Sequence, residues 1–315
     1  MGDHAKTVRD TALSKSGGAV SALAASWNRS LVVHGLDPDV AAPRGRADHS
    51  AFVEARDRLG RIAAIAAPMM ERLFAAVGSS GCSIVLTDTS GIILERRGRA
   101  EDDETFKQWG LWTGADWSEA REGTNGIGTC LVEQRPVVIQ RDQHFASRNI
   151  GLNCMGAPIF DHEGELAGVL DISSCRADLG EPMVALIGDA VADAARRIEA
   201  ENFQASFAGK RIIVGPGDGA GGAVLFAVDR DDLLIGATRR ARKAFSLSHE
   251  NFRNPKPARD VLQEFGAGGP DLDAAERGEL RRALAGANGN ASQAAKALGI
   301  SRATLYRRMA RVGLR

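Results

Sequence analysis

The sequence predicts three folded parts in series: a mixed α/β (α+β) domain with flanking helices, a small β-containing unit, and an all-helical C-terminal unit. Three observations support this order. Apolar residues recur at helical spacing over 48–77 and again over 182–207, and short β runs lie between these stretches. Gly and Pro gather in a linker that ends near residue 271. Basic residues dominate the segment that follows.

The β runs are marked by turn residues. "SIVLTDTSGIILERRG" predicts a hairpin around Asp88–Gly91, "RPVVIQ" a further strand, and "GAPIFDHEGELAGVLDISS" a second hairpin. "LFAVDRDDLLIGAT" predicts one more hairpin in the small unit, with a short basic helix after it. At the other end, residues 1–16 are polar and are expected to lack regular structure, and a short helix is expected over about 18–31. Pro68 is expected to kink the 48–77 helix.

Composition places the chain among ordinary globular proteins. Of its 315 residues, 44% are hydrophobic and 25% are charged, and the formal net charge is zero. The four cysteines form no CxxC pair, the N-terminus carries no apolar signal segment, and no run of 18 apolar residues occurs. These features predict a cytoplasmic protein with reduced thiols and no membrane association.

The charges are distributed unevenly along the chain. Residues 276–315 contain nine basic and two acidic side chains, a local charge of +7, so the remaining residues sum to −7. Residues 302–315 contain no acid at all. This asymmetry predicts a polyanionic partner for the C-terminal end, because a solvated helix face normally mixes both signs.

Three short helices are expected in that end, over 273–284, over 291–298 and from a cap at Ser301 to residue 312. Asn290 is expected to cap the second helix. In the third helix, Leu305, Met309 and Val312 form one apolar face, expected to pack on the second helix through Ala294, Ala295, Leu298 and Ile300. Thr304, Arg307, Arg308 and Arg311 form another face. This arrangement is a helix-turn-helix, whose second helix can enter the major groove of DNA.

"NASQAAKALGISRATLYRRMARVGL" resembles the Fis-type helix-turn-helix of bacterial enhancer-binding regulators, over about 40 residues. The resemblance implies that Ser301 and Arg302 face bases. It implies that Ser292, Thr304, Arg307 and Arg308 mostly hold the DNA backbone, that Tyr306 helps position the helix, and that the unit acts as a dimer on a palindromic site. Arg311 lies on the same cationic face and is also expected to contact DNA. The alternative is a merely solvated charged face.

Residues 114–145, "GADWSEAREGTNGIGTCLVEQRPVVIQRDQHF", contain closely set glycines at 123, 126 and 128. Their spacing, without a preceding strand or a following Lys-Ser/Thr, argues against a dinucleotide or phosphate-binding loop. Such glycines are expected instead to let a loop fold over a pocket, ahead of a helix that contains Cys130.

This segment resembles the GAF domain of the acetoin-catabolism activators, and the resemblance covers roughly residues 24–176. It includes "SWNRSLVVHGLDPD", "SGCSIVLTDTSGIILERRG" and the second hairpin. Members of that family are bacterial transcription activators that respond to small metabolites such as acetoin, alcohols or ketones. The resemblance implies a GAF sensor domain over 45–208, after an N-terminal tail and short helix over 1–44, with flanking helices that dimerise. A small degenerate PAS-like unit with its linker is expected over 209–257, and the Fis-type domain over 258–315.

The sequence departs from that family in one respect. Family members usually carry a central ATPase that engages sigma-54 polymerase, but no GxxxxGK[ST] loop occurs in this sequence. "GPGDGAGG" lacks the lysine that would meet a nucleotide phosphate, and the stretch between the sensor and the helix-turn-helix is too short for the ATPase. The chain is therefore expected not to hydrolyse ATP and to need no cofactor.

The pocket of the sensor is expected to involve five residues: Trp117, Glu122, Thr124, Asn125 and Cys130. Core packing is the alternative role for each. His144, Cys130 and Cys154 fit no short metal motif, so buried structural cysteines and a surface histidine are expected, with no metal. A cysteine redox sensor would require exposed thiols of low pKa. No catalytic arrangement such as Ser-His-Asp or HExxH is visible.

Together these observations predict a one-component bacterial transcriptional regulator and not an enzyme. Its expected partners are double-stranded DNA, a small-molecule effector and a second copy of the chain, with RNA polymerase or a related regulator as further candidates. The alternative is an accessory interaction protein that modulates a full-length sigma-54 activator or a signalling partner in trans.

Overall fold

The computed structural model describes residues 2–14, 21–39, 46–217, 221–262 and 272–314. The chain forms two compact units, 1–258 and 259–315, and each is described by itself. None of the helices in the described ranges is long and apolar enough to cross a membrane.

The first unit is built on a five-stranded antiparallel sheet with the strand order β2-β1-β5-β4-β3. Both predicted hairpins and the predicted "RPVVIQ" strand are present in it. The strands are β1 (Cys82–Asp88), β2 (Ile93–Arg97), β3 (Val137–Gln140), β4 (Asn153–Phe160) and β5 (Leu166–Ser174). Because β3 pairs only with β4, it forms an edge of the sheet.

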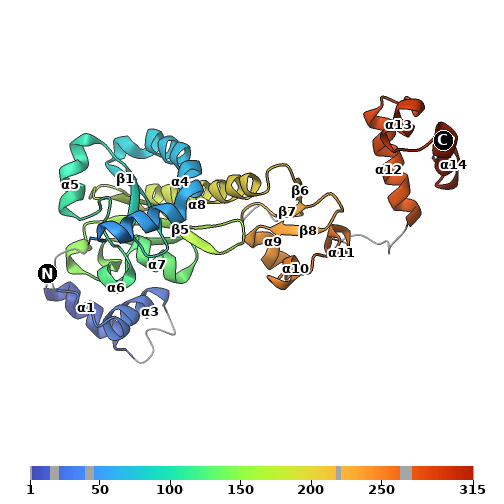
Figure 1. Ribbon diagram of the computed structural model, residues 1–315. Helices are drawn as coiled ribbons and strands as arrows, with labels where there is room; N and C mark the ends of the chain where they lie inside the picture. The colour runs from blue at the N-terminus through green and yellow to red at the C-terminus, as the bar shows by residue number, and fades with distance from the viewer. Residues whose placement is uncertain (1, 15–20, 40–45, 218–220, 263–271, 315) are drawn as a thin grey trace. The chain divides into compact units, whose positions relative to one another are not determined.

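Two long helices, α4 (His49–Val77) and α8 (Glu181–Ser206), cover one face of this sheet (Figure 1). Their apolar stripes meet the alternate strand residues that point to that face, such as Ile84, Ile172 and Met155. The predicted apolar stripe of α8 (Val184, Ile187, Val191, Ala195 and Ile198) is buried in this core. The backbone of α4 departs from helical geometry at Gly60 and not at the predicted Pro68, because glycine tolerates the positive φ of 27° found there.

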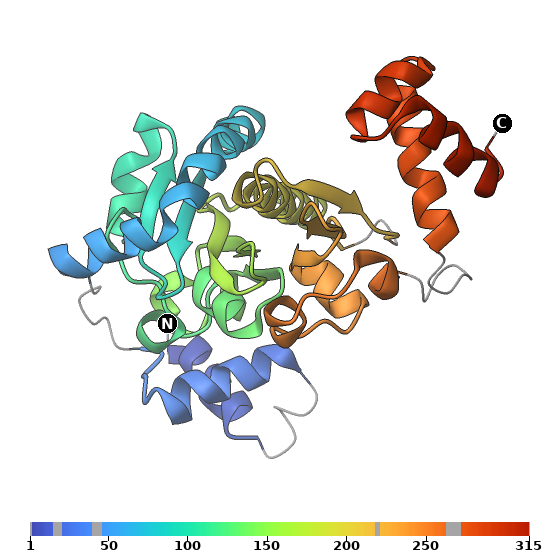
Figure 2. The same cartoon turned by 45° about the vertical axis from the view of Figure 1, so that its right-hand side comes forward.

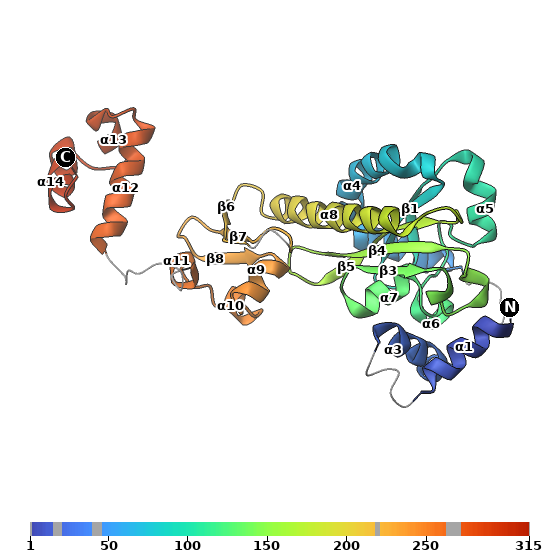
Figure 3. The same ribbon diagram turned by 180° about the vertical axis from the view of Figure 1, so that it is seen from behind.

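The opposite face of the sheet is covered by short helices, seen clearly from behind in Figure 3. They are α5 (Asp103–Gln108), α6 (Glu119–Glu122) and α7 (Gly126–Glu133). Phe106, Trp117 and Ile127 from this layer pack against Val85 and Cys154 of the sheet. This face carries the segment in which the sequence predicted a pocket.

The N-terminal residues are helical, so the expectation that residues 1–16 lack regular structure is wrong. Helix α1 (Gly2–Ala12) packs against α3 (Ala22–Asn28), which continues as a π-helical turn over Arg29–Val33. Ala5, Val8 and Ala12 recur at helical spacing and are buried, and Val8 and Ala12 share a core with Trp27 and Phe145. Because two of its three side chains are alanines, this stripe is only weakly apolar in the sequence, and the segment was expected to be polar. Figure 2 shows both helices beside the α6–α7 layer.

A three-stranded antiparallel sheet follows α8, with the order β6-β7-β8. Its strands are β6 (Arg211–Val214), β7 (Leu225–Val228) and β8 (Leu234–Ala237), and the last two form the predicted hairpin. Phe203 near the end of α8 packs with Leu225 and Ala227 of β7, so α8 contributes to both cores. Three short helices follow: α9 (Arg239–Ala244), α10 (Glu250–Arg253) and α11 (Ala258–Leu262). Helix α11 lies within the expected linker, and residues 263–271 of that linker lie outside the described residues.

The second unit contains the three predicted helices, α12 (Leu272–Gly286), α13 (Ala291–Ala297) and α14 (Arg302–Arg311). Leu305, Met309 and Val312 of the predicted apolar face are buried with Ala294 and Ala295 of α13. Asn290 accepts hydrogen bonds from the backbone N–H groups of Ser292 and Gln293, and Ser301 accepts one from Thr304. The predicted fold class is therefore confirmed in both units.

The docking of α1 predicts a stability effect. Val8→Ala should lower the free energy of unfolding by about 2 kcal/mol, because two fully buried methyl groups are removed and a cavity remains. Leu13→Ala is the matched control, since Leu13 is 64% exposed. Denaturant titration of both variants checks this, and equal effects would contradict the burial of α1.

Candidate functional site

The glycine-rich turn between α6 and α7 is shaped by close packing. A Cβ on Gly123, where φ is +66°, would lie 2.5 Å from the Phe145 ring. A Cβ on Gly126 would lie 2.5 Å from Oδ1 of Asp171, and one on Gly128 would lie 2.4 Å from the backbone nitrogen of Glu119. These glycines therefore allow the turn to approach the sheet and its neighbours.

Asn125 fixes the conformation of the same turn. Its side-chain oxygen accepts hydrogen bonds from the backbone N–H groups of Ile127 and Gly128, both at 2.9 Å, and so caps α7. Its amide group donates to the carbonyls of Trp117 at 3.1 Å and Gly123 at 2.8 Å. Both amide hydrogens and the oxygen are thus engaged within the turn.

The other residues predicted for the pocket are also bonded inside the protein. Trp117 is 1% exposed and donates from Nε1 to the Gly110 carbonyl at 2.9 Å. The buried Glu122 accepts hydrogen bonds from Arg148 at 2.8 Å and from Asn149 at 3.2 Å. Cys130 is fully buried, and burial raises the pKa of its thiol well above the ordinary value. A role of these three in ligand binding stays a prediction.

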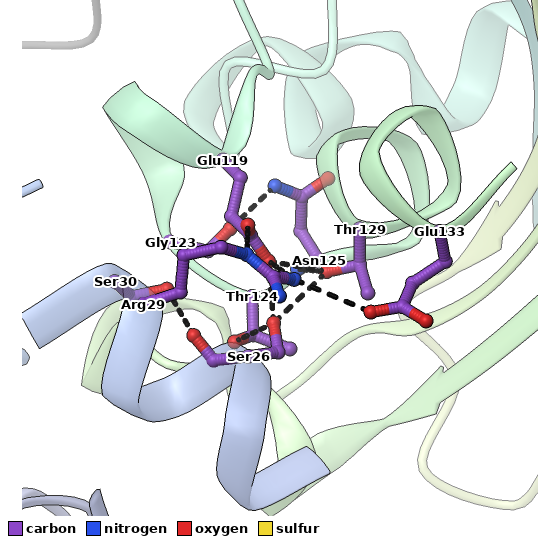
Figure 4. A network of polar contacts seen from close by, with 9 residues as sticks. All are labelled: Ser26, Arg29, Ser30, Glu119, Gly123, Thr124, Asn125, Thr129 and Glu133. Atoms are coloured by element: carbon purple, nitrogen blue, oxygen red, sulfur yellow. Dashed lines mark hydrogen bonds and ion pairs between the residues drawn. The ribbon is translucent and has the colours of Figure 1, made fainter. Parts of the chain in front are cut away.

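Thr124 belongs to a buried polar network that joins the N-terminal helices to the turn (Figure 4). Its hydroxyl lies 2.7 Å from the hydroxyl of Ser26, which donates to the carboxylate of Glu119. Thr129 donates to the same carboxylate at 3.2 Å. Arg29 donates to Glu119 from Nε at 2.5 Å and from Nη2 at 3.0 Å, and these hydrogen bonds raise the pKa of its guanidinium.

Sequence reasoning missed Ser26, Arg29 and Glu119. They lie within two segments of the GAF resemblance, "SWNRS" and "DWSEARE", 93 residues apart for the Ser26–Glu119 bond. A serine before Trp27 and an arginine after it give no sign of a buried acidic partner. Only the folded chain brings them together.

A cavity of about 190 Å³ adjoins this network, between α3, α7 and β3. Of the five residues predicted for the pocket, Thr124 alone lines it. The lining also includes Ser26 and Thr129 of the network.

A second buried polar cluster lies between the sheet and α7. His144 is fully buried, so the expectation of a surface histidine is wrong; its Nε2 lies 3.3 Å from Sγ of Cys154. Burial lowers the pKa of His144 to about 4 and raises that of the Cys154 thiol far above its ordinary value. Within the described ranges, no group of three or more His, Cys, Asp or Glu side chains is placed to hold a metal ion.

Asp171 completes this cluster. The Ser173 hydroxyl lies 2.6 Å from its Oδ2 and 3.1 Å from Sγ of Cys154. Its Oδ1 has no hydrogen-bond partner among the described residues. Burial raises the pKa of this carboxyl to about 7, because the charged form is poorly solvated there.

The C-terminal unit presents the residues predicted to contact DNA. Ser301, Arg302, Tyr306 and Arg307 are exposed on α14, Ser292 is exposed on α13, and Thr304 is half-buried. Arg302 lies near the ring of Tyr306 and donates to its hydroxyl at 3.4 Å. Among the residues that the structure describes, Arg302 and Arg307 have no acidic partner.

Arg308 and Arg311 are placed differently from the other arginines of α14. Both contact the carboxylate of Glu276 on α12, Arg308 at 3.4 Å and Arg311 through a direct hydrogen bond. Arg311 also lies 3.9 Å from Asp273. In this structure the two arginines tie α14 to α12, so two of the four arginines predicted to contact DNA are partly neutralised by an acidic side chain.

The buried Asp171 predicts a pH effect on stability. Its folded-state pKa of about 7 lies above the unfolded value of 3.8, so the contribution of Asp171 to stability falls as pH rises between these values. Asp171→Asn removes this contribution. The free energy of unfolding of the variant, relative to that of the wild type, should therefore rise by roughly 1 kcal/mol per pH unit between pH 5 and 7. Denaturant titrations at several pH values measure the difference. Asp189→Asn, on the exposed side of α8, should run parallel to wild type, and parallel curves for Asp171→Asn would contradict the prediction.

Two family models match the chain. Residues 61–198 match the GAF domain, and residues 272–311 match the "Bacterial regulatory protein, Fis family". The crystal structure of the E. coli DhaR(N)-DhaL complex contains a chain of similar fold, with a TM-score of 0.52 and 16% identity, covering 72% of this chain and 77% of that one.

Curated relatives are regulators by name. The chain is 29% identical to the acetoin catabolism regulatory protein of Cupriavidus necator, over 69% of this chain and 33% of that protein. It is 37% identical to the acetoin dehydrogenase operon transcriptional activator AcoR of Bacillus subtilis, over 42% of this chain and 22% of that protein. It is 32% identical to the propane 2-monooxygenase operon transcriptional activator MimR of Mycolicibacterium smegmatis, over 50% of this chain and 26% of that protein.

The chain thus spans a third or less of the length of these relatives. Both resemblances found in the sequence are confirmed by the family models. The protein is a GAF-domain chain with a C-terminal helix-turn-helix of the Fis family, related to the acetoin-catabolism regulators.

Proposed function

We propose that this chain is a transcriptional regulator that binds double-stranded DNA through α13 and α14 and responds to a small organic effector through its GAF domain. The main support is the exposed face of α14. Arg302 and Arg307 are solvated there without an acidic partner among the described residues, while the opposite side of the helix is buried in the three-helix core. A cationic face on a rigid support suits phosphate and base-edge contacts in a major groove.

The chain is proposed to act as a dimer on a palindromic site, with half-sites one helical turn apart. The apolar stripes of α4 and α8 are used inside one chain, against the sheet. The start of α8 leaves Met183 at 44% and Leu186 at 63% exposure. A contact between copies is therefore proposed there. Exposed apolar side chains on a long helix can pack against their own symmetry mates.

Regulation is proposed to occur without ATP hydrolysis by this chain. The segment between α8 and α12 contains a three-stranded sheet and short helices, and its "GPGDGAGG" stretch carries no lysine. Contacts to RNA polymerase or to a related regulator would then convert DNA binding into control of transcription. Such a role belongs in the cytoplasm.

The DNA-binding proposal is tested with DNA from upstream of the gene for this chain. Arg302→Ala combined with Arg307→Ala should weaken binding at least about tenfold and lower the slope of log affinity against log salt by about one, because Arg307 loses a phosphate contact and Arg302 a base contact. Fluorescence anisotropy at several salt concentrations measures both. The control, Arg281→Ala with Arg282→Ala, removes the same charge from α12.

Three outcomes would count against this proposal. Equal losses in both double variants would show that net charge and not α14 governs binding. Binding that does not respond to salt would remove the role of the arginines. Absence of DNA binding altogether would favour an accessory interaction protein.

Glu276 predicts opposite effects on stability and DNA affinity. Glu276→Gln should lower the free energy of unfolding by about 1 kcal/mol, because it removes the contacts that tie α14 to α12. The same variant should bind DNA more tightly, since Arg308 and Arg311 lose their competing anion. Glu279→Gln is the matched control, because Glu279 pairs only with Arg282 on its own helix among the described residues. Thermal unfolding and anisotropy check both effects; unchanged DNA affinity would contradict the competition.

A further inference from the structure

The cavity beside the buried network has walls from two distant parts of the sequence. Helix α3 contributes Ala22, Leu23 and Ser26, while the GAF domain contributes the turn before α7, α7 itself and strand β3. The N-terminal helices are therefore part of the wall of this cavity. A GAF domain without them would leave the site open on one side.

The contact between the N-terminal helices and the GAF domain, here called the seam, is held by a hydrogen bond of Trp27 and an ion pair of Arg29. Trp27 is 6% exposed and donates from Nε1 to the carbonyl of Gln143 at 2.9 Å. Arg29 forms a two-pronged ion pair with Glu119, whose side chain is 1% exposed. Breaking such a pair leaves a buried charge without compensation, which is strongly unfavourable. The wall formed by α3 is thus held in place before any ligand arrives.

The size of the cavity limits what it can hold. Its volume is about 190 Å³, which is below the range of drug-sized sites, roughly 300–1,000 Å³. A cavity of about 150 Å³ in another protein accommodates benzene. The cavity here therefore suits a molecule of about six to nine non-hydrogen atoms.

One wall of the cavity is polar and the other is apolar. Hydroxyl groups come from Ser26, Thr124 and Thr129, and apolar surface comes from Leu23 and strand β3. Because β3 is an edge strand, some of its backbone N–H and C=O groups have no partner strand on the outer side. The hydroxyl protons of Ser26 and Thr129 are donated to Glu119, and Thr124 lies against Ser26, so these hydroxyls can accept from a ligand hydroxyl. An outward N–H of β3 can donate to a hydroxyl or carbonyl oxygen.

The charges at the rim neutralise one another. The Glu133 carboxylate lies 3.5 Å from Arg29 and 3.5 Å from Arg135, so neither sign dominates at the opening. A charged ligand would lose its hydration without gaining an unpaired counter-charge. An uncharged ligand avoids that loss.

On the inner face of the sheet, helix α7 and strand β4 are closely packed. A Cβ on Gly126 would meet Asp171 and Cys154 at 2.5 Å, and one on Gly156 would meet the carbonyl of Gly126 at 2.5 Å. Helix α7 therefore lies directly on the sheet there. Trp117, Asn125 and Cys130 belong to this closed region and to its loop, not to the cavity wall.

We propose that the effector site is this cavity, shared between α3 and the α7–β3 edge of the GAF domain, and that it takes a small uncharged molecule with hydroxyl or carbonyl groups. The site rests on the proposed sensing function and adds its location and the part of its wall that α3 forms. Binding would tighten the seam, since both walls contact the same molecule.

The test uses the full chain and a panel of small probes. The uncharged probes are 1,2-propanediol, 2-butanone, cyclohexanol and phenol; propionate and isopropylamine are the charged counterparts. At least one uncharged probe should raise the melting temperature in a saturable manner, and the charged probes should not. Ala22→Phe should weaken that binding at least about tenfold, because its ring fills the cavity from an exposed rim position. Ser21→Phe, an exposed neighbour that does not line the cavity, should leave it unchanged.

A second measurement uses the wild-type chain, so its result does not depend on whether Ala22→Phe folds. Methyl NMR spectra with the bound probe should show the largest shifts at Leu23, Val137 and Ile139, and small ones at Ile127 and Val85 of the interior. Largest shifts in the interior would overturn the location. Failure of all uncharged probes, or preference for a charged one, would overturn the ligand class. DNA binding by α14 is measured separately, so it stands or falls independently of these outcomes.

Discussion

The ion pair between Arg29 and Glu119 is the contact on which the sensor half of the molecule depends. Glu119 is buried at the start of α6, and its charge is compensated by Arg29, Ser26 and Thr129 together. Without Arg29 a buried carboxylate would stand among hydroxyl groups alone, at a cost of several kcal/mol. The same contact orders α3, the turn before α7 and the wall of the cavity. The same ion pair thus contributes to the stability of the sensor half and to the shape of the candidate effector site.

The DNA-reading half shows a different use of charge. Its arginines divide into a pair without an acidic partner among the described residues, Arg302 and Arg307, and a pair that contacts Glu276, Arg308 and Arg311. The second pair joins α14 to α12 in addition to the apolar packing between them. A polyanion bound to α14 would compete with Glu276 for the same two cations.

Much of the fold could be predicted from the sequence, because the local sequence patterns favour the same helices and strands that the tertiary contacts stabilise. The turn residues of both GAF hairpins, the stripe of α8 and the caps Asn290 and Ser301 all specify structure within a few residues.

The failures have physical reasons. Ala5, Val8 and Ala12 bury a stripe too small to register as apolar, and the kink of α4 follows from the freedom of Gly60 rather than from Pro68. The pocket residues were chosen for their residue types near glycines, and their role in ligand binding stays a prediction; Asn125 and Glu122 form hydrogen bonds within the protein. The wall contributed by α3 depends on a contact across 93 residues, which no local pattern reveals.

Helix α8 has one further consequence. Its first turns are buried against the five-stranded sheet, and Phe203 near its other end is buried with the strands of the small sheet. An uninterrupted α-helix resists twisting, because each turn is fastened to the next by backbone hydrogen bonds. Any rotation imposed at one end must therefore reappear at the other with the same sign and nearly the same size. The length of this helix, counted in residues, sets the phase between the two sheets, and one inserted residue would shift that phase by about 100°.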